Sequence, residues 1–112
     1  VYKRQGVATG ELLGAMSEAG SEVMGVDWRV PLDTAAKRFA SPRVLQGNLD
    51  PVLLFAGTDV VREEIARIKN EAARAVEAGD ATGHIFNLGH GVLPTTDADA
   101  ITEAVRIIHE EN

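Results

Sequence analysis

Short runs of hydrophobic residues alternate along the chain with longer segments in which hydrophobic residues recur every three or four positions. The short runs lie at residues 23–27, 44–47 and 84–88, and polar residues or glycines follow each of them. Runs of this length, bounded by turn-forming residues, are typical of buried strands. The sequence therefore predicts three strands, each with polar groups at its carboxyl end.

The segments between these runs have the spacing of amphipathic helices. We expect a first helix from a cap at Thr9 to Gly20, where glycine suits a left-handed end. A short helix should follow at residues 33–39, and Pro51 should begin another helical turn. A helical segment thus precedes or follows every predicted strand.

The longest helix should begin at Thr58 or Asp59 and end at Gly79. Its hydrophobic residues recur with helical spacing at Val61, Ile65, Ile68, Ala72 and Val76. Charged residues take other positions, namely Glu63, Glu64, Arg67, Lys69 and Glu71. This pattern predicts one buried stripe along an otherwise polar helix.

A last helix should be capped at Thr96. We expect one of its faces to bear Ile101, Ala104, Val105 and Ile108. The chain then ends within a few residues of this helix.

Strict alternation of apolar strands with helices predicts an α/β fold with a parallel sheet covered by helices. Three strands are too few to stand alone. A (β/α)8 barrel fits better than a doubly wound sheet, because polar residues gather at the carboxyl ends of the strands and no G-x-G-x-x-G motif opens a helix.

Composition narrows the classes of protein further. The chain has 45% hydrophobic and 25% charged residues, as a globular domain has, and it has no cysteine. It therefore has no disulfide framework and no thiolate metal site, and no hydrophobic run reaches the roughly 20 residues of a membrane span. A net charge of −6 makes nucleic acid an unfavourable partner.

Three motifs, GVDWR at 25–29, QGNLDP at 46–51 and FNLGHG at 86–91, resemble the carboxyl-terminal third of uroporphyrinogen decarboxylases in order and spacing. The resemblance extends from Gly6 to Asn112. It implies that residues 6–112 are the carboxyl-terminal portion of a single (β/α)8 TIM barrel, with its last three strands and their helices. It also implies a cytoplasmic homodimer that acts on a porphyrinogen without a cofactor.

Residues 1–5 do not fit the strand that the family pattern would place before Gly6. They are polar and aperiodic, and one reading of their codons matches the end of a transposon adapter used in shotgun sequencing. We interpret them as a translated adapter artefact.

His90 is the principal candidate for a catalytic and substrate-binding residue. It follows a predicted strand between Gly89 and Gly91, and glycines on both sides allow a ligand to approach the backbone closely. The resemblance implies that this histidine contacts the porphyrinogen. From the residues alone, a ring that only bonds neighbouring backbone is an equal alternative.

Arg29 is a second candidate for substrate binding, because an arginine pairs well with a carboxylate. A surface ion pair would explain it equally well, and Asp27 before it is expected to support the loop near the cleft. Gln46, Asn48 and Asp50 lie at the next strand end, where their side chains bond either substrate or neighbouring loops. We favour loop scaffolding for these three, as for Gly89 and Gly91.

The other histidines have structural explanations. His84 begins a strand, and His109 is favourable near the end of a helix because of the helix dipole. We expect no metal site.

By resemblance, the reaction is decarboxylation of the four acetate side chains of uroporphyrinogen III to coproporphyrinogen III. Protonation of a pyrrole carbon creates the electron sink, so the enzyme supplies a positioned acid and a water-poor cleft. The aspartate and arginines that bind the substrate belong to the amino-terminal part of the family barrel. We therefore expect these 112 residues alone to be inactive and, as an open arc with two strand edges, poorly folded.

Two alternatives stay open. One is a methyltransferase of the same barrel superfamily that passes methyl groups between corrinoid proteins and thiols at a zinc site, which would require His and Cys ligands. The other is a non-enzymatic module that binds a partner protein through its apolar faces.

Overall fold

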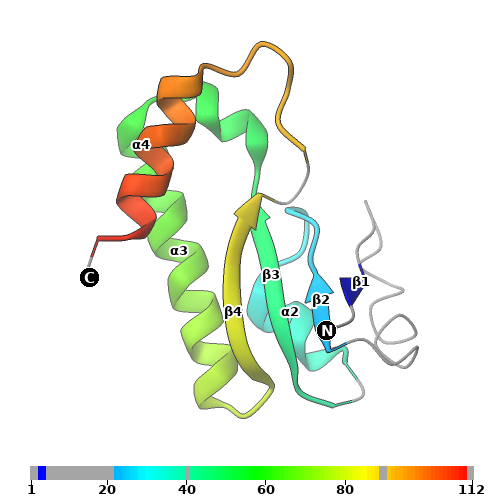
Figure 1. Cartoon of the computed structure of the whole chain (residues 1–112). Helices are drawn as coiled ribbons and strands as arrows, with labels where there is room; N and C mark the ends of the chain where they lie inside the picture. Colours follow the sequence, from blue (N-terminus) through cyan, green and yellow to red (C-terminus); the bar gives the residue numbers. More distant parts are fainter. Residues whose placement is uncertain (1–2, 5–21, 40, 89–90, 111–112) are drawn as a thin grey trace.

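The structure, a computed structural model, describes residues 3–4, 22–39, 41–88 and 91–110. In this part of the chain, parallel strands form one sheet in the order β1-β2-β3-β4. The strands are β1 (Lys3–Arg4), β2 (Val23–Gly25), β3 (Arg43–Leu49) and β4 (Ala81–Leu88). The helices are α2 (Leu32–Lys37), the 3-10 helix η2 (Pro51–Phe55), α3 (Thr58–Glu77) and α4 (Ala98–Ile108). Figure 1 shows that β2, β3 and β4 point the same way and that a helix follows each of β2 and β3.

The three predicted strands are confirmed as β2, β3 and β4, and the parallel α/β arrangement is confirmed with them. Strand β2 ends at Gly25 and not at Asp27. The prediction that His84 begins a strand is wrong, because β4 already pairs with β3 from Ala81. The predicted helix from Thr9 to Gly20 lies outside the described residues. Strand β3 extends beyond the predicted 44–47 to Leu49. Asn48 and Leu49 continue the pairing with β4, although Asn48 is polar.

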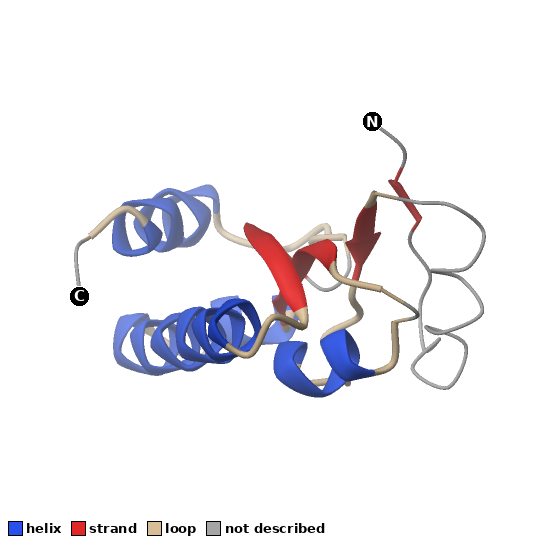
Figure 2. Ribbon diagram, turned by 90° about the horizontal axis from the view of Figure 1, so that it is seen from below, coloured by secondary structure: helices blue, strands red, loops and turns tan. Residues whose placement is uncertain are grey.

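Only one face of the sheet contributes to the main hydrophobic core. Met24, Leu45 and Leu49 are at most 1% exposed and belong to a cluster with residues of α2, α3 and α4. Figure 2 shows α2 and α3 on the same side of the strands. Residues at the alternate register positions, such as Gln46 paired with Ile85, lie on the opposite face, and Ile85 is 44% exposed.

Helix α3 is the longest element and packs its apolar stripe on the sheet. Ile65 and Ile68 are buried as predicted, and the helix ends one residue before Ala78, with Gly79 at φ 78°. Val76 was predicted on the buried stripe, and this is wrong, because Ala75 is buried instead while Val76 is 43% exposed. Ala75 follows the buried Ala72 at a spacing of three, so it continues the buried stripe and the adjacent Val76 points away from it.

Helix α4 differs from the prediction in its cap and in its buried face. Asp97 caps it, since its side chain accepts a hydrogen bond from the backbone N–H of Asp99 at 2.9 Å, whereas Thr96 lies outside the helix. Ala104 and Ile107 are buried, and Val105 is 49% exposed. The buried face of α4 is therefore rotated relative to the predicted face, because it includes Ile107 and not Val105.

Strand β1 was not predicted. Lys3 and Arg4 pair with Val23 and Met24 of β2. Strand pairing uses backbone groups, so a polar two-residue segment without a hydrophobic pattern is able to form it. The pairing says nothing of where residues 1–5 originate, and their adapter origin stays a prediction.

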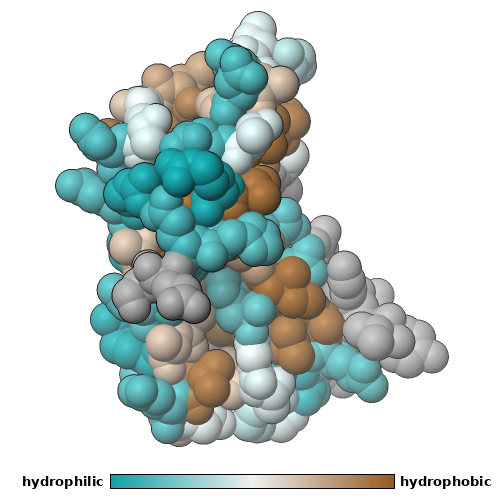
Figure 3. All heavy atoms as spheres, turned by 60° about the vertical axis from the view of Figure 1, so that its left-hand side comes forward, coloured by the Kyte–Doolittle hydropathy of each residue, from teal (hydrophilic) through white to brown (hydrophobic). Residues whose placement is uncertain are grey.

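The side of the molecule formed by α3, α4 and the β4 edge is mostly hydrophilic, with separate hydrophobic patches (Figure 3). The exposed large hydrophobic residues of the described part are Trp28, Val52, Phe55, Val60, Val76, Ile85, Val92, Leu93 and Val105. No helix in the described ranges combines the length and the apolar character that a membrane span needs.

Two adjacent valines on α3 test the assignment of its buried stripe. Val61 is 4% exposed and Val60 is 37% exposed. We expect Val61→Ala to lower the free energy of unfolding by roughly 2 kcal/mol, because it removes two buried methyl groups and leaves a cavity. Because these 112 residues alone are expected to fold poorly, denaturant unfolding measures this loss in a full-length protein that carries this chain as its carboxyl-terminal part. Val60→Ala is the matched control and should change it by less than about 0.5 kcal/mol; equal losses would contradict the assignment.

Candidate functional site

The carboxyl ends of β2, β3 and β4 meet at one edge of the sheet, because all three strands are parallel. Gly25 lies beside Gln46, and Asn48 lies beside Asn87 in the register. The pairing brings the segments that contain the first two predicted motifs next to each other and next to the end of β4. The structure therefore places the polar side chains that end β3 and β4, such as Asn48 and Asn87, at the same edge of the sheet.

Asp27 and Arg29 form a closed unit directly after β2. The Asp27 carboxylate is buried and accepts a hydrogen bond from the backbone N–H of Arg29 at 2.9 Å. Its two oxygens also accept from Nη1 of Arg29 at 3.0 and 2.8 Å. The guanidinium lies 4.5 Å from the centre of the Trp28 ring, a cation–π contact. The ion pair that the sequence left open for Arg29 is thus present, and the side chain is still 46% exposed.

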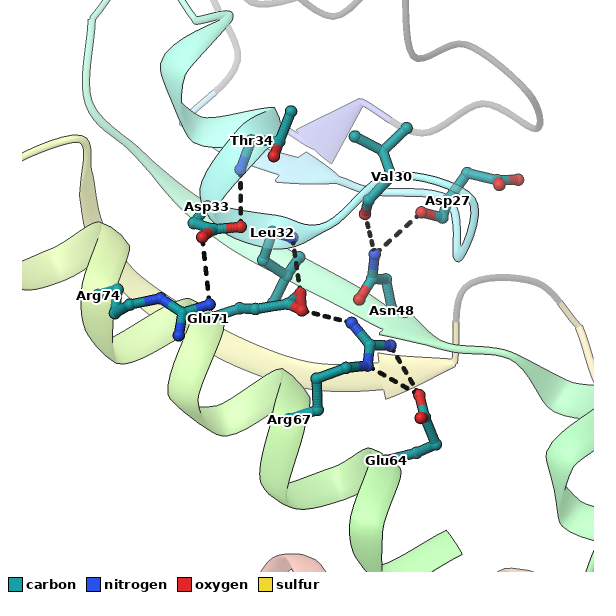
Figure 4. A network of polar contacts seen from close by, with 10 residues as sticks. All are labelled: Asp27, Val30, Leu32, Asp33, Thr34, Asn48, Glu64, Arg67, Glu71 and Arg74. Carbon is teal, nitrogen blue, oxygen red and sulfur yellow. Dashed lines mark hydrogen bonds and ion pairs between the residues drawn. The ribbon is translucent and has the colours of Figure 1, made fainter. Parts of the chain in front are cut away.

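Asn48 is buried at 1% exposure and bonds the loop between β2 and α2 (Figure 4). Its Nδ2 donates to the carbonyl oxygen of Asp27 at 3.0 Å and to that of Val30. Since both acceptors belong to the backbone of one loop, these contacts support loop scaffolding for Asn48.

Two side-chain oxygens near this edge are buried without a hydrogen-bond partner. They are Oε1 of Gln46 and Oδ1 of Asn48. Buried acceptors are usually paired, so these two favour a hydrogen-bond donor that the described residues do not supply. Asp50 has a local role instead, since its side chain accepts from the backbone N–H of Val52 at 3.0 Å and caps η2.

Gly47 allows β3 to pass close to β2. Its φ is 141°, and a Cβ built on it would lie 2.6 Å from the carbonyl oxygen of Val26, too close for any side chain. The Gly47 carbonyl is in turn 2.7 Å from Nε2 of His84, so a neutral ring with its proton on Nε2 donates to it. Burial lowers the pKa of His84, although the bond to Gly47 alone would raise it.

His90 and Gly89 lie outside the described residues, and their predicted roles stay predictions. Strand β4 ends at Leu88, and Gly91 is exposed at the start of the segment that leads to α4. His109 ends α4 as an exposed residue whose N–H bonds the carbonyl of Val105 at 3.2 Å.

The residue that sequence reasoning missed is Glu71. It was predicted among the polar positions of α3, and this is wrong, because it is 4% exposed. Its Oε1 accepts from the backbone N–H of Leu32 at 3.1 Å, and its Oε2 pairs with Arg67. Burial lowers the pKa of Arg67, but its bonds to Glu64 and Glu71 outweigh burial and raise it. The spacing of three between Ile68 and Glu71 was the signal that could have placed Glu71 on the buried stripe.

Within the ranges that the structure describes, no three His, Asp or Glu side chains gather in a way that could hold a metal ion. The polar groups at the strand ends are instead a mixture of carboxylate, guanidinium and amide, suited to hydrogen bonding and to pairing with anions.

Comparison with known proteins gives one consistent family. The family model described as uroporphyrinogen decarboxylase (URO-D) matches residues 5–111. A relative named uroporphyrinogen decarboxylase from Corynebacterium diphtheriae is 78% identical over 104 residues, which are 93% of this chain and 30% of the relative. Relatives with the same name from Corynebacterium efficiens and Rhodococcus erythropolis are 75% and 64% identical, again over 93% of this chain and 30% and 29% of their own lengths. The chain thus spans about 30% of the length of these curated relatives.

Replacement of Gly47 tests the close approach of β3 to β2. We expect Gly47→Ala to lower the free energy of unfolding by more than roughly 2 kcal/mol, since the new Cβ would strike the Val26 carbonyl and φ would be unfavourable. Gly83→Ala on β4 is the control, because nothing lies within 4 Å of a Cβ there. Denaturant unfolding of a full-length protein that carries this chain measures both variants, and a Gly47 variant as stable as the Gly83 variant would contradict the geometry.

The lowered pKa of His84 predicts a pH dependence of stability. The folded state binds the proton of His84 less readily than the unfolded chain does, so this contribution is present above a pH of about 6.5 and is lost as the pH falls below it. We expect wild type to lose more stability than His84→Gln between about pH 7.5 and about pH 5.5. Unfolding free energies at both pH values, measured in a full-length protein that carries this chain, give this difference, and equal losses for wild type and His84→Gln would refute it.

Proposed function

This chain belongs to the uroporphyrinogen decarboxylase family, and on this premise we propose that it forms the carboxyl-terminal part of a cytoplasmic carboxy-lyase of porphyrin and haem biosynthesis. The complete enzyme would remove the four acetate carboxyl groups of uroporphyrinogen III and produce coproporphyrinogen III. The observation that supports this most directly is the meeting of polar strand ends at one edge of a parallel sheet, in a chain 78% identical to a protein of that name.

The complete fold would be a (β/α)8 barrel to which this chain contributes the last three strands and their helices, within residues 6–112. Two features support the proposal. In the described part of the chain, β4 pairs with β3 alone, so one edge of this strand is available to a further strand. On the sheet face opposite the helices, Ile85 is 44% exposed beside the buried Gln46, and in a complete barrel this face would point inward.

In the proposed mechanism the catalytic residue is His90, two positions after the last residue of β4 in the sequence, and it contacts the porphyrinogen. Arg29 binds one substrate carboxylate, and both contacts of its guanidinium to Asp27 use the same nitrogen, Nη1. Asp27, Gln46 and Asn48 support the loops around the cleft, with Gly89 and Gly91 beside the histidine. No cofactor is needed, because the protonated pyrrole ring accepts the electrons left by the departing carbon dioxide.

The complete protein would act as a homodimer. Exposed hydrophobic side chains support this proposal, since Val52 and Phe55 on η2 and Val92 and Leu93 before α4 are 40–55% exposed. Both segments lie beyond the carboxyl ends of β3 and β4 (Figure 1). Apolar residues at such a rim are typical of a protein contact.

A chimera tests the proposed function. In it, this chain replaces the matched 30% of the Corynebacterium diphtheriae relative. We expect the chimera to convert uroporphyrinogen III into coproporphyrinogen III, and these 112 residues alone to be inactive, because the rest of the cleft is then missing. A folded chimera without activity, next to an active parent, would refute the proposal.

His90→Gln in this chimera tests the catalytic residue. We expect the rate of decarboxylation to fall by roughly 100-fold, which is the typical contribution of one positioned acid or base. His109→Gln, the same substitution at the exposed end of α4, should leave the rate within about twofold of that of the unchanged chimera. Equal rates for the two variants would exclude His90 from catalysis.

A further inference from the structure

The buried carboxylate of Glu71 joins α3 to the start of α2 (Figure 4). Its Oε1 accepts from the backbone N–H of Leu32 at 3.1 Å, across 39 positions of sequence. Its Oε2 pairs with Arg67, and Arg67 also pairs with Glu64 at 2.8 Å. The charge of Glu71 is therefore compensated inside the protein, where an unpaired carboxylate would be unfavourable.

Helix α2 depends on this contact because it has no cap of its own. Pro31, which precedes it, has no N–H and makes no side-chain cap. The N–H of Leu32 is the first donor of the helix, and Leu32 is fully buried. A carboxylate at this point satisfies the donor and interacts favourably with the helix dipole.

The same contact fixes one end of the loop at residues 27–31. Asn48 binds the carbonyls of Asp27 and Val30, and Glu71 binds the N–H of Leu32, the next residue after the loop. Arg29 lies between these anchors, with its own N–H on the Asp27 carboxylate. The two buried side chains therefore hold the loop from β3 on one side and from α3 on the other.

We infer that Glu71 is a positioning residue, which holds the 27–31 loop together with Asn48 and so sets the place of the Arg29 guanidinium at the candidate site. The inference rests on the proposed function only where Arg29 contacts a substrate carboxylate. It extends that function to a helix residue remote from the strand ends, whose effect on substrate passes through the backbone of the loop.

A surface contact between the same two helices provides the matched control. Arg74 on α3 pairs with Asp33 on α2 at 3.2 Å, but its side chain is 62% exposed and it does not bond the loop. Loss of this pair weakens the link between α2 and α3 and leaves the Leu32 N–H on Glu71. Arg74→Gln thus separates helix packing from positioning of the loop.

The experiment uses the chimera with Glu71→Leu, Glu71→Gln or Arg74→Gln. In hydrogen exchange followed by mass spectrometry, we expect Glu71→Leu to speed exchange of the amides of residues 28–30 and 32 by roughly tenfold or more, with β3 unchanged. Glu71→Gln retains an acceptor for Leu32 but loses the ion pair, so it should speed exchange by only about threefold. Arg74→Gln should leave these amides as they are.

Kinetics with uroporphyrinogen III test the consequence for Arg29. Glu71→Leu should raise KM by about fivefold or more with kcat within about twofold, and Glu71→Gln should restore most of the affinity. Combined with Arg29→Gln, the KM effect of Glu71→Leu should largely disappear, because the two act through one contact. Independent, multiplicative KM effects would overturn the role in positioning Arg29.

Unchanged exchange in the loop, or a uniform increase over α2, α3 and β3, would also overturn the inference, since Glu71 would then only stabilise the fold. If Glu71→Leu does not fold, the hydrogen exchange of the Glu71→Gln variant decides. Loop amides that exchange as fast in this variant as in the unchanged chimera would refute the inference. An inactive chimera would count against the proposed function alone, and the exchange data would still decide whether Glu71 holds the loop.

Discussion

Parallel pairing of β3 with strands on both sides is the constraint on which the described structure depends. β3 joins β2 and β4 through backbone hydrogen bonds, and its alternate side chains face α3 or the open face of the sheet. Because the strands are parallel, their carboxyl ends meet at one edge and the chain must return through a helix after each of β2 and β3. The apolar core on one side and the polar groups at the strand ends both follow from this pairing.

Three polar side chains of this arrangement bond backbone groups in segments that are distant in sequence. Asn48 bonds two carbonyls of a loop, Glu71 bonds the first donor of a helix, and His84 contacts the carbonyl of Gly47. An unpaired group at any of these positions would destabilise the fold by roughly 1–3 kcal/mol. Each contact joins segments distant in sequence, so the loops at the strand ends have defined positions although their own sequences are polar and short.

The proposal that the chain is part of a larger fold rests on β4, which pairs with β3 alone in the described residues and bears the 44% exposed Ile85. An isolated parallel arc exposes backbone donors and acceptors at its edge and apolar groups such as Ile85 on its face. A barrel removes both problems, because a further strand pairs with the edge and the opposite wall covers the face. The 30% share of the relatives' length agrees with this interpretation.

Hydrophobic periodicity and turn residues act locally, so the amino-acid sequence alone specifies which segments become strands and helices. It located β2 to β4 and α3 within a few residues, and its three motifs indicated the family. Tertiary structure decided which residues on a helix face are buried, so Glu71 and Ile107 are buried while Val76 and Val105 are exposed. It also decided the partners of Asn48 and Arg29, since a side chain's hydrogen bonds depend on backbone that only folding brings near.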